Sequence, residues 1–267
     1  MGEIDMKTAF STLCCTELSV SEIVELAEKA NIDAIELRVD HVLLEELLSN
    51  SGETDNLCAK GVAVCDIASS IFIRGEGETP DWESYVKLAY VIGSPAVRVF
   101  ASCGSDGELS LDTIADDLRL LCDIAGKYGI EIWLENHSEL SRLSACRELY
   151  DKVNRDNIKI LWDVLHSIEY GEALETSLSY AGDLVAHVHL KDGVHVEGQT
   201  EYKLCALGEG SFPFGRLADN LKKIKYNGYL SLEWESRWHP YLGEIYADNL
   251  ELLEKYKEIL KNTGFFE

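Results

Sequence analysis

Short apolar runs rich in β-branched and aromatic residues recur along the chain, and most segments between them have the hydrophobic spacing of helices. Successive runs start about 26 to 45 residues apart, which leaves room for one strand and one crossover helix in each unit. Strands that alternate with helices predict a parallel sheet. The eight predicted strands are 8–13, 34–39, 62–67, 96–100, 130–134, 158–162, 184–190 and 229–234.

Helix-capping residues support this division of the chain. Ser19 and Glu22 stand three residues apart before an apolar segment, which is the spacing of a capping box. Ser110 is expected to cap the helix before the fifth strand, because its side-chain oxygen can accept a free backbone N–H. Apolar residues at helical spacing predict a last helix at about 245–260, which would cover the outside of the eighth strand.

The chain length fits a single domain, because one α/β barrel takes about 250 residues and this chain has 267. Neither a Gly/Ser-rich linker nor a shift in composition divides the sequence. An open doubly wound sheet would share the alternation of strands and helices, but eight evenly spaced units favour closure. We therefore expect one (β/α)8 TIM barrel over residues 1–267. Its longest irregular segment, 192–211, follows the seventh strand, where barrel enzymes carry functional loops.

Polar residues stand at the ends of the last four predicted strands: Glu135, Asp163, His189 and Glu233. In a closed barrel these four ends converge on one face. Three carboxylates and one imidazole suit a divalent ion such as Mn²⁺, Mg²⁺, Co²⁺ or Zn²⁺. Without a cation, the packed acidic groups would raise one another's pKa values at a cost in stability. The sequence therefore predicts one divalent metal ion.

Two of the four expected ligands have close alternatives. His187 and His189 share one face of the seventh strand because side chains alternate with a period of two, and His189 is preferred as the residue nearer the strand end. Glu233 and Glu235 share a face for the same reason. Glu233 is preferred because Glu235 lies further into the following loop.

Five further polar residues are candidates for substrate binding: His166, Lys191, Arg98, Arg237 and His239. His166, three residues after Asp163, is expected to donate a hydrogen bond to the substrate rather than to bind metal. Lys191 could equally be a solvated loop residue. For Arg98, and for Glu36 and Arg38 on the second strand, the alternative is an internal Glu–Arg ion pair.

The charge of the chain limits its partners. The 48 acidic and 24 basic residues give a formal net charge of −24, which repels nucleic acids and anionic membranes at long range. We therefore expect neither as a partner. A small anionic substrate stays possible, because a few basic residues in a pocket can outweigh the net charge locally. A homo-oligomer is also compatible with the sequence.

The cysteines and the first residues point to a cytoplasmic protein. The eight cysteines include no C-x-x-C pair and mostly lie in apolar runs, so we expect reduced core thiols. Residues 1–7 do not form the basic and apolar regions of a secretory signal. No apolar stretch reaches the roughly 18 residues that a membrane span requires.

Four motifs follow one another in the order of a known family. Glu135 lies in L-E-N-H, Asp163 in D-x-x-H, His189 in H-x-H-x-K-D and Glu233 in G-Y-L-S-L-E. Together they resemble the xylose-isomerase-like sugar-phosphate isomerase/epimerase superfamily over nearly the whole chain. The resemblance implies that the matching Glu, Asp, His and Glu bind the metal. It also implies that Glu135 and Glu233 exchange a proton with the substrate, on opposite faces of the reacting carbon.

The expected activity is the isomerisation or epimerisation of a small keto-sugar, polyol or hydroxy-carbonyl compound. A metal that bridges a carbonyl and its neighbouring hydroxyl acidifies the carbon-bound proton, and a nearby carboxylate can remove it to give an enediolate. Return of the proton gives an epimer or an isomer. Loss of a neighbouring hydroxyl gives dehydration instead, so an inosose-type dehydratase is the closest alternative.

Two other classes of protein share this kind of barrel. A sugar-binding module without activity would have no need of both glutamates, which disfavours that alternative. The endonuclease-IV-like DNA repair enzymes carry a trinuclear zinc cluster with histidines on earlier strands. Here the ends of the third and fourth strands, 65–69 and 100–103, contain no histidine, and the net charge of −24 opposes DNA binding.

Overall fold

The computed structural model describes residues 6–50, 62–74, 81–102 and 110–266, together with Gly52 and Leu57. Its core is a closed barrel of eight parallel strands in the order β1-β10-β7-β6-β5-β4-β3-β2, and β1 also pairs with β2. The predicted barrel is therefore confirmed. The strands are β1 (Lys7–Ser11), β2 (Ala34–Val39), β3 (Ala63–Ile73), β4 (Ala96–Ala101), β5 (Glu131–Glu135), β6 (Ile158–Asp163), β7 (Val185–Leu190) and β10 (Tyr229–Leu232).

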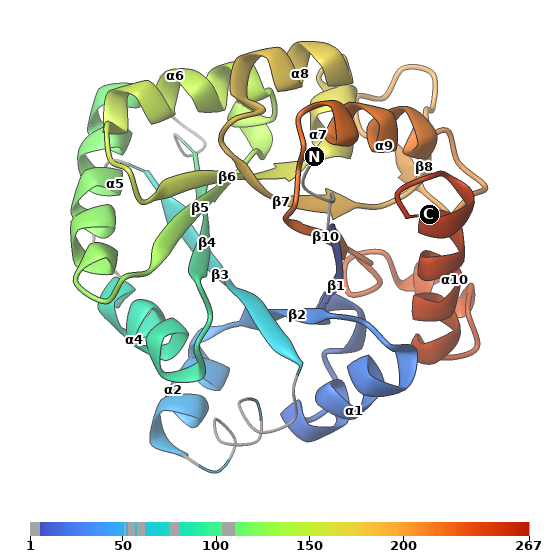
Figure 1. Ribbon diagram of the computed structural model, residues 1–267, viewed down its shortest axis with the longest axis horizontal. Helices are drawn as coiled ribbons and strands as arrows, with labels where there is room; N and C mark the ends of the chain where they lie inside the picture. The colour runs from blue at the N-terminus through green and yellow to red at the C-terminus, as the bar shows by residue number, and fades with distance from the viewer. Residues whose placement is uncertain are drawn as a thin grey trace.

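Helices encircle the strands and cover the outside of the barrel (Figure 1). Their apolar faces pack on the strands in one large hydrophobic core. Within the described residues, the α-helices are α1 (Val20–Ala30), α2 (His41–Ser49), α4 (Trp82–Ile92), α5 (Leu111–Gly126), α6 (Leu143–Val153), α7 (Val164–Glu169), α8 (Leu174–Ala181), α9 (Phe214–Lys223) and α10 (Asn249–Asn262). Short 3-10 helices are η1 (Thr12–Cys15), η2 (Ser138–Leu140) and η3 (Pro240–Glu244).

The predicted helix caps are present. The Ser19 side chain accepts from the backbone N–H of Glu22, whose carboxylate accepts from Ser19 in return, so the capping box is complete. Ser110 caps α5 through the backbone N–H of Thr113. The last helix was predicted too early, because α10 begins only at Asn249, where the Asp248 side chain caps it.

The segment predicted as irregular, 192–211, contains a short antiparallel ribbon, β8 (Gly193–Val194) with β9 (Lys203–Leu204). Asp192 fixes the base of this segment. Its buried carboxylate accepts backbone N–H groups from Gly193 and Gly208 at 2.8 Å and from Gly210 and Phe212 at 3.1 Å. A Cβ atom on Gly210 would lie 2.0 Å from Asp192 Oδ1, so only glycine allows this close approach.

The cysteines of the described residues are free thiols, as expected. Five of them are buried and Cys205 is half-buried. Cys58 and Cys103 lie outside the described residues. Over the same part of the chain, no helix combines the length and the apolar character needed to cross a membrane.

Candidate metal centre

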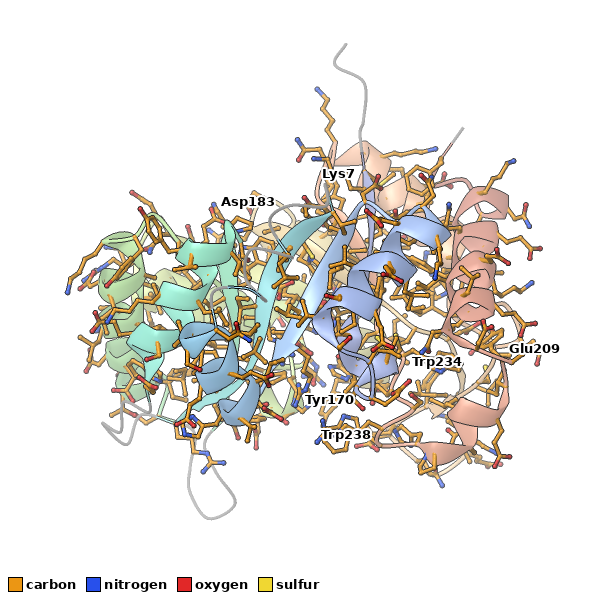
Figure 2. The ribbon with its side chains drawn as sticks, turned by 90° about the horizontal axis from the view of Figure 1, so that it is seen from below. Lys7, Tyr170, Asp183, Glu209, Trp234 and Trp238 are labelled. Atoms are coloured by element: carbon orange, nitrogen blue, oxygen red, sulfur yellow. The ribbon has the colours of Figure 1, made fainter. Side chains whose placement is uncertain are left out.

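One end of the barrel collects polar side chains. Figure 2 shows Tyr170 and Trp238 at this end and Lys7 and Asp183 at the opposite end. Lys7 is the first residue of β1 and Asp183 precedes β7, so Tyr170 and Trp238 mark the carboxyl ends of the strands. This is the face where barrel enzymes place their active sites.

At this face, four strand ends bring Glu135, Asp163, His189 and Glu233 together, and we call these residues the ligand quartet. Glu135 and Asp163 are the last residues of β5 and β6, His189 is the last but one of β7, and Glu233 directly follows β10. Each side chain offers one ligand atom, and these atoms all lie within 4.8 Å of one another. All four residues are buried.

The residues of the quartet fit a divalent cation. His189 Nδ1 lies 3.5 Å from Glu233 Oε2 and 3.9 Å from Glu135 Oε1. Within the described residues, His189 Nδ1 and Glu135 Oε2 are buried without a hydrogen-bond partner. Burial raises the pKa of Glu135 to about 7, although Arg98 and His189 oppose the shift. A metal ion would supply the missing partner and the missing positive charge.

Glu36 on β2 contacts both candidate histidines of β7. Its Oε2 accepts hydrogen bonds from His189 Nε2 at 2.6 Å, from His187 Nε2 at 3.1 Å and from the Ser231 hydroxyl at 3.0 Å. The bond to Nε2 leaves Nδ1 of His189 facing the carboxylates, the arrangement in which a carboxylate orients a metal-binding imidazole. His187 lies outside the quartet.

Lys191 is buried, with 3% of its surface exposed, so the alternative of a solvated loop residue is wrong. Its ammonium group lies 2.8 Å from Asp163 Oδ2 and 2.7 Å from Glu233 Oε2, and it also donates to Glu235. Burial alone would lower the pKa of Lys191, but these carboxylates raise it well above its usual value. Glu235 thus pairs with Lys191 and is not part of the quartet.

Arg98 is also buried inside the barrel. Its Nε lies 3.3 Å from Glu135 Oε2, and its guanidinium stacks over the Phe100 ring at 4.2 Å. The internal Glu–Arg ion pair given as the alternative for Arg98 is therefore present, with Glu135 as the acidic partner. Arg98 consequently contacts a residue of the quartet directly.

A cavity of about 280 Å³ is lined by three of the predicted substrate-binding residues, His166, Lys191 and His239, and also by Glu235. His166 Nδ1 lies 3.0 Å from the backbone oxygen of Asn136, and its Nε2 lies 3.5 Å from Lys191 Nζ. The ribbon of 192–211 adds Tyr202 and Leu204 to the wall. Since Lys191 contacts both Asp163 and Glu233, the cavity adjoins the quartet.

The structure does not place Arg237 in that cavity. Arg237 is exposed, stacks on Trp238 at 5.1 Å, and lines a separate cavity of about 340 Å³ with Arg38. Arg237, predicted to bind substrate, therefore does not line the cavity that His166, Lys191 and His239 share.

Asn136 is a residue of the site that the sequence interpretation did not single out. Its side-chain oxygen accepts from the backbone N–H of Asp163 at 2.6 Å, and its amide donates to the backbone oxygens of Ser141 and Asp163 at 2.7 and 2.9 Å. Asn136 thus fixes the end of β6 against the end of β5. Its place between Glu135 and His137 in the L-E-N-H motif was the available signal.

Comparison with protein families matches residues 24–256 to the xylose isomerase-like TIM barrel. The 3-dehydroshikimate dehydratase of Bacillus anthracis is 23% identical over 240 residues, 81% of this chain and 86% of that protein. An uncharacterized protein of Methanocaldococcus jannaschii is 29% identical over 158 residues, 57% of this chain. That match spans about half of the relative's length, 48%.

Solved structures show the same fold. The IolI protein, solved with a binding zinc atom, superposes with a TM-score of 0.80 at 22% identity, covering 98% of this chain and 100% of that one. The D-allulose 3-epimerase from Methylomonas sp. superposes with a TM-score of 0.75 at 18% identity, covering 97% and 98% of the two chains. Relatives and structural neighbours thus include sugar epimerases and a dehydratase.

Proposed function

Because the chain belongs to the xylose isomerase-like TIM barrel family, we propose that it is a divalent-metal-dependent isomerase or epimerase. Its substrate is a small keto-sugar, polyol or hydroxy-carbonyl compound. The observation that carries this proposal is the ligand quartet, whose atoms come from four separate strand ends yet lie within 4.8 Å of one another. Barrels support such convergence at their carboxyl face.

Glu135, Asp163, His189 and Glu233 would hold the ion, which is one of Mn²⁺, Mg²⁺, Co²⁺ or Zn²⁺. A bound ion would polarise a carbonyl oxygen and so acidify the neighbouring carbon-bound proton. Glu135 and Glu233 would remove and return that proton as general base and acid. The environments of the two differ, because burial raises the pKa of Glu135 to about 7, whereas Lys191 and His189 overcome burial and hold the pKa of Glu233 well below its usual value.

The remaining polar residues would orient the substrate. His166, Lys191 and His239 place hydrogen-bonding groups around the cavity beside the quartet, where they could bind hydroxyl or carbonyl oxygens. Arg98 contacts Glu135 at 3.3 Å and would fix the position of that carboxylate. Arg237 would contact only a part of the substrate that extends toward the cavity beside Arg38.

Solvent deuterium exchange tests the proposal. The metal-loaded protein would be incubated in D₂O with a panel of keto-sugars and hydroxy-ketones, and carbon-bound deuterium followed by NMR. We expect deuterium at a carbon next to the carbonyl of at least one compound, and loss of this signal after chelation. Tight binding of a sugar without exchange at any carbon would instead indicate a binding protein.

Dehydration is the second candidate, and the similarity to a dehydratase over 240 residues favours it specifically. The same quartet serves both reactions, because both begin with removal of a proton next to a carbonyl. Mass spectrometry separates them: an isomerase or epimerase conserves the mass of its substrate, whereas a dehydratase releases one water.

A cytoplasmic location and the exclusion of nucleic acid as a partner stay predictions from the sequence.

Replacing Glu36 by Gln should weaken metal binding by about 10–100-fold, the typical cost of losing a partner that orients a ligand. Gln lacks the charge that favours a proton on His189 Nε2, so Nδ1 would less often be free for the metal. The measurement is Mn²⁺ affinity by titration. Glu45→Gln on α2 is the control, because the Glu45 side chain is 73% exposed. Equal affinity of the Glu36→Gln variant and wild type would refute the orienting role.

A further inference from the structure

A second group of potential ligands lies inside the barrel and takes no part in the proposed reaction. Cys65 and Asp66 on β3 and His187 on β7 offer ligand atoms that lie within 4.8 Å of one another, and we call them the inner cluster. All three side chains are buried, with 0% exposure. His187 precedes His189 by two residues and therefore lies one step closer to the amino end of the barrel.

Several polar atoms here have no partner. Asp66 Oδ2, His187 Nδ1 and Glu36 Oε1 are buried and make no hydrogen bond with any residue that the structure describes. Buried polar atoms are nearly always paired, because desolvation without a partner is costly. Two of these atoms, Asp66 Oδ2 and His187 Nδ1, belong to the inner cluster, and an ion held there would supply their missing partner.

Burial makes the charged forms of both acidic side chains of the inner cluster costly when no cation is bound. Burial and the nearby Glu36 carboxylate raise the pKa of Asp66 well above its usual value, although Arg98 and His189 oppose the shift. Burial and Asp66 likewise raise the pKa of Cys65. A divalent ion would stabilise the charged forms of both side chains, since a coordinating thiol is deprotonated outright.

We propose that the inner cluster binds one Zn²⁺ ion through Cys65 Sγ, the Asp66 carboxylate and the ring of His187. A thiolate, an imidazole and a carboxylate form a set that zinc prefers over Mg²⁺ or Mn²⁺. His187 Nε2 donates to Glu36 Oε2 at 3.1 Å, as His189 Nε2 does at 2.6 Å. Glu36 would therefore orient one histidine for each of two metal centres.

The position of the inner cluster assigns this ion a structural role. In the barrel, β3 and β7 are separated by β4, β5 and β6 on one side and by β2, β1 and β10 on the other. They therefore lie across the interior from each other. A zinc ion bound by both strands would connect opposite sides of the barrel below the quartet, among side chains that have no exposed surface.

Cobalt substitution tests the proposal. The full-length protein would be loaded with Co²⁺, its bound metal counted by elemental analysis, and its near-ultraviolet spectrum recorded for thiolate-to-cobalt charge transfer. We expect two ions per chain and a charge-transfer band, which the quartet cannot produce because it has no sulfur. Cys65→Ser should lose the band and one ion. Cys146→Ser, which replaces another buried thiol, should keep both.

A single ion per chain with no charge-transfer band in the wild type would overturn the proposal, and this result does not depend on how any variant folds. The same band in Cys65→Ser, or its loss in Cys146→Ser, would overturn it as well. Asp163→Asn separates the two sites: it should remove the quartet's ion and leave the charge-transfer band. A failure of the quartet is thus distinguishable from a failure of the inner cluster.

Discussion

Glu135→Gln should lower the rate of solvent deuterium exchange into the substrate by about 10²–10⁴-fold, the usual contribution of a general acid or base. Gln has nearly the same shape, so the packing against Arg98 is preserved, but its amide cannot take up a proton. The substitution also removes a negative charge from the quartet and should weaken metal binding. Exchange is therefore measured at saturating metal, with the bound metal counted in the same sample.

Glu139→Gln is the matched control for this experiment. Glu139 lies four residues further along on η2, is exposed and belongs to no group of potential ligands among the described residues. We expect its exchange rate to equal that of the wild type. If Glu135→Gln bound metal and exchanged deuterium as fast as the wild type, Glu135 would be neither ligand nor proton-transfer group.

Asp192→Ala should destabilise the fold by about 3–5 kcal/mol. Asp192 is 1% exposed and accepts four backbone N–H groups, three from the segment 192–211 and one from Phe212 directly after it, of which those of Gly193 and Phe212 are buried. A buried donor left without an acceptor costs about 1–3 kcal/mol. The expected loss is a large part of the free energy of unfolding of a typical domain, which is roughly 5–15 kcal/mol. The change in the free energy of unfolding is measured by urea unfolding, and the slope of the transition is compared between the variant and the wild type.

Asp192→Asn provides the graded comparison. Asn keeps one acceptor oxygen of the same shape, so we expect a smaller loss of stability than with Ala. Because Tyr202 and Leu204 of this segment line the cavity beside the quartet, both variants should also bind substrate less well. A change of less than about 0.5 kcal/mol in Asp192→Ala, the range of ordinary surface substitutions, would show that Asp192 does not hold the segment.

The barrel could be predicted because its eight strands alternate with helices of clear periodicity. The strand ends were less predictable, since they depend on pairing partners. β3 continues to Ile73 because, after a register shift, Phe72 and Ile73 pair with Phe100 and Ala101 of β4. Similarly, Tyr246 fits the apolar spacing of the predicted last helix. In the structure Tyr246 lies before α10, and its hydroxyl accepts a hydrogen bond from the backbone N–H of Leu207.

The quartet could be predicted from the position of four polar residues at strand ends. The alternation of side chains along a strand does not distinguish His187 from His189, because it places both side chains inside the barrel. The choice depends on which ring reaches the other three ligands, and only the folded barrel shows that His189 does so within 4.8 Å. Tertiary contacts likewise bury Lys191 among three carboxylates, which a sequence pattern does not reveal.

The inner cluster lay beyond prediction for a different reason. Cys65 and Asp66 are consecutive residues, and in a regular strand they would point to opposite faces. The register between β2 and β3 shifts after Ile35, which pairs with Val64, while Glu36 pairs with Asp66. Cys65 is thus the extra residue of an irregularity that brings the ligand atoms of both side chains within 4.8 Å.

The most direct test of the ligand quartet is the binding of Mn²⁺, followed through the electron paramagnetic resonance signal of the free ion. Mn²⁺ prefers carboxylate and imidazole ligands and disfavours the thiol of the inner cluster. Asp163→Asn removes one ligand while the Asn side chain can still cap α7, as the Asp163 carboxylate does through the His166 N–H at 3.1 Å. We predict one Mn²⁺ per chain for the wild type and for Cys65→Ser, and none for Asp163→Asn at the same concentrations. Equal Mn²⁺ binding by the wild type and Asp163→Asn would contradict a metal centre at the carboxyl end of the barrel.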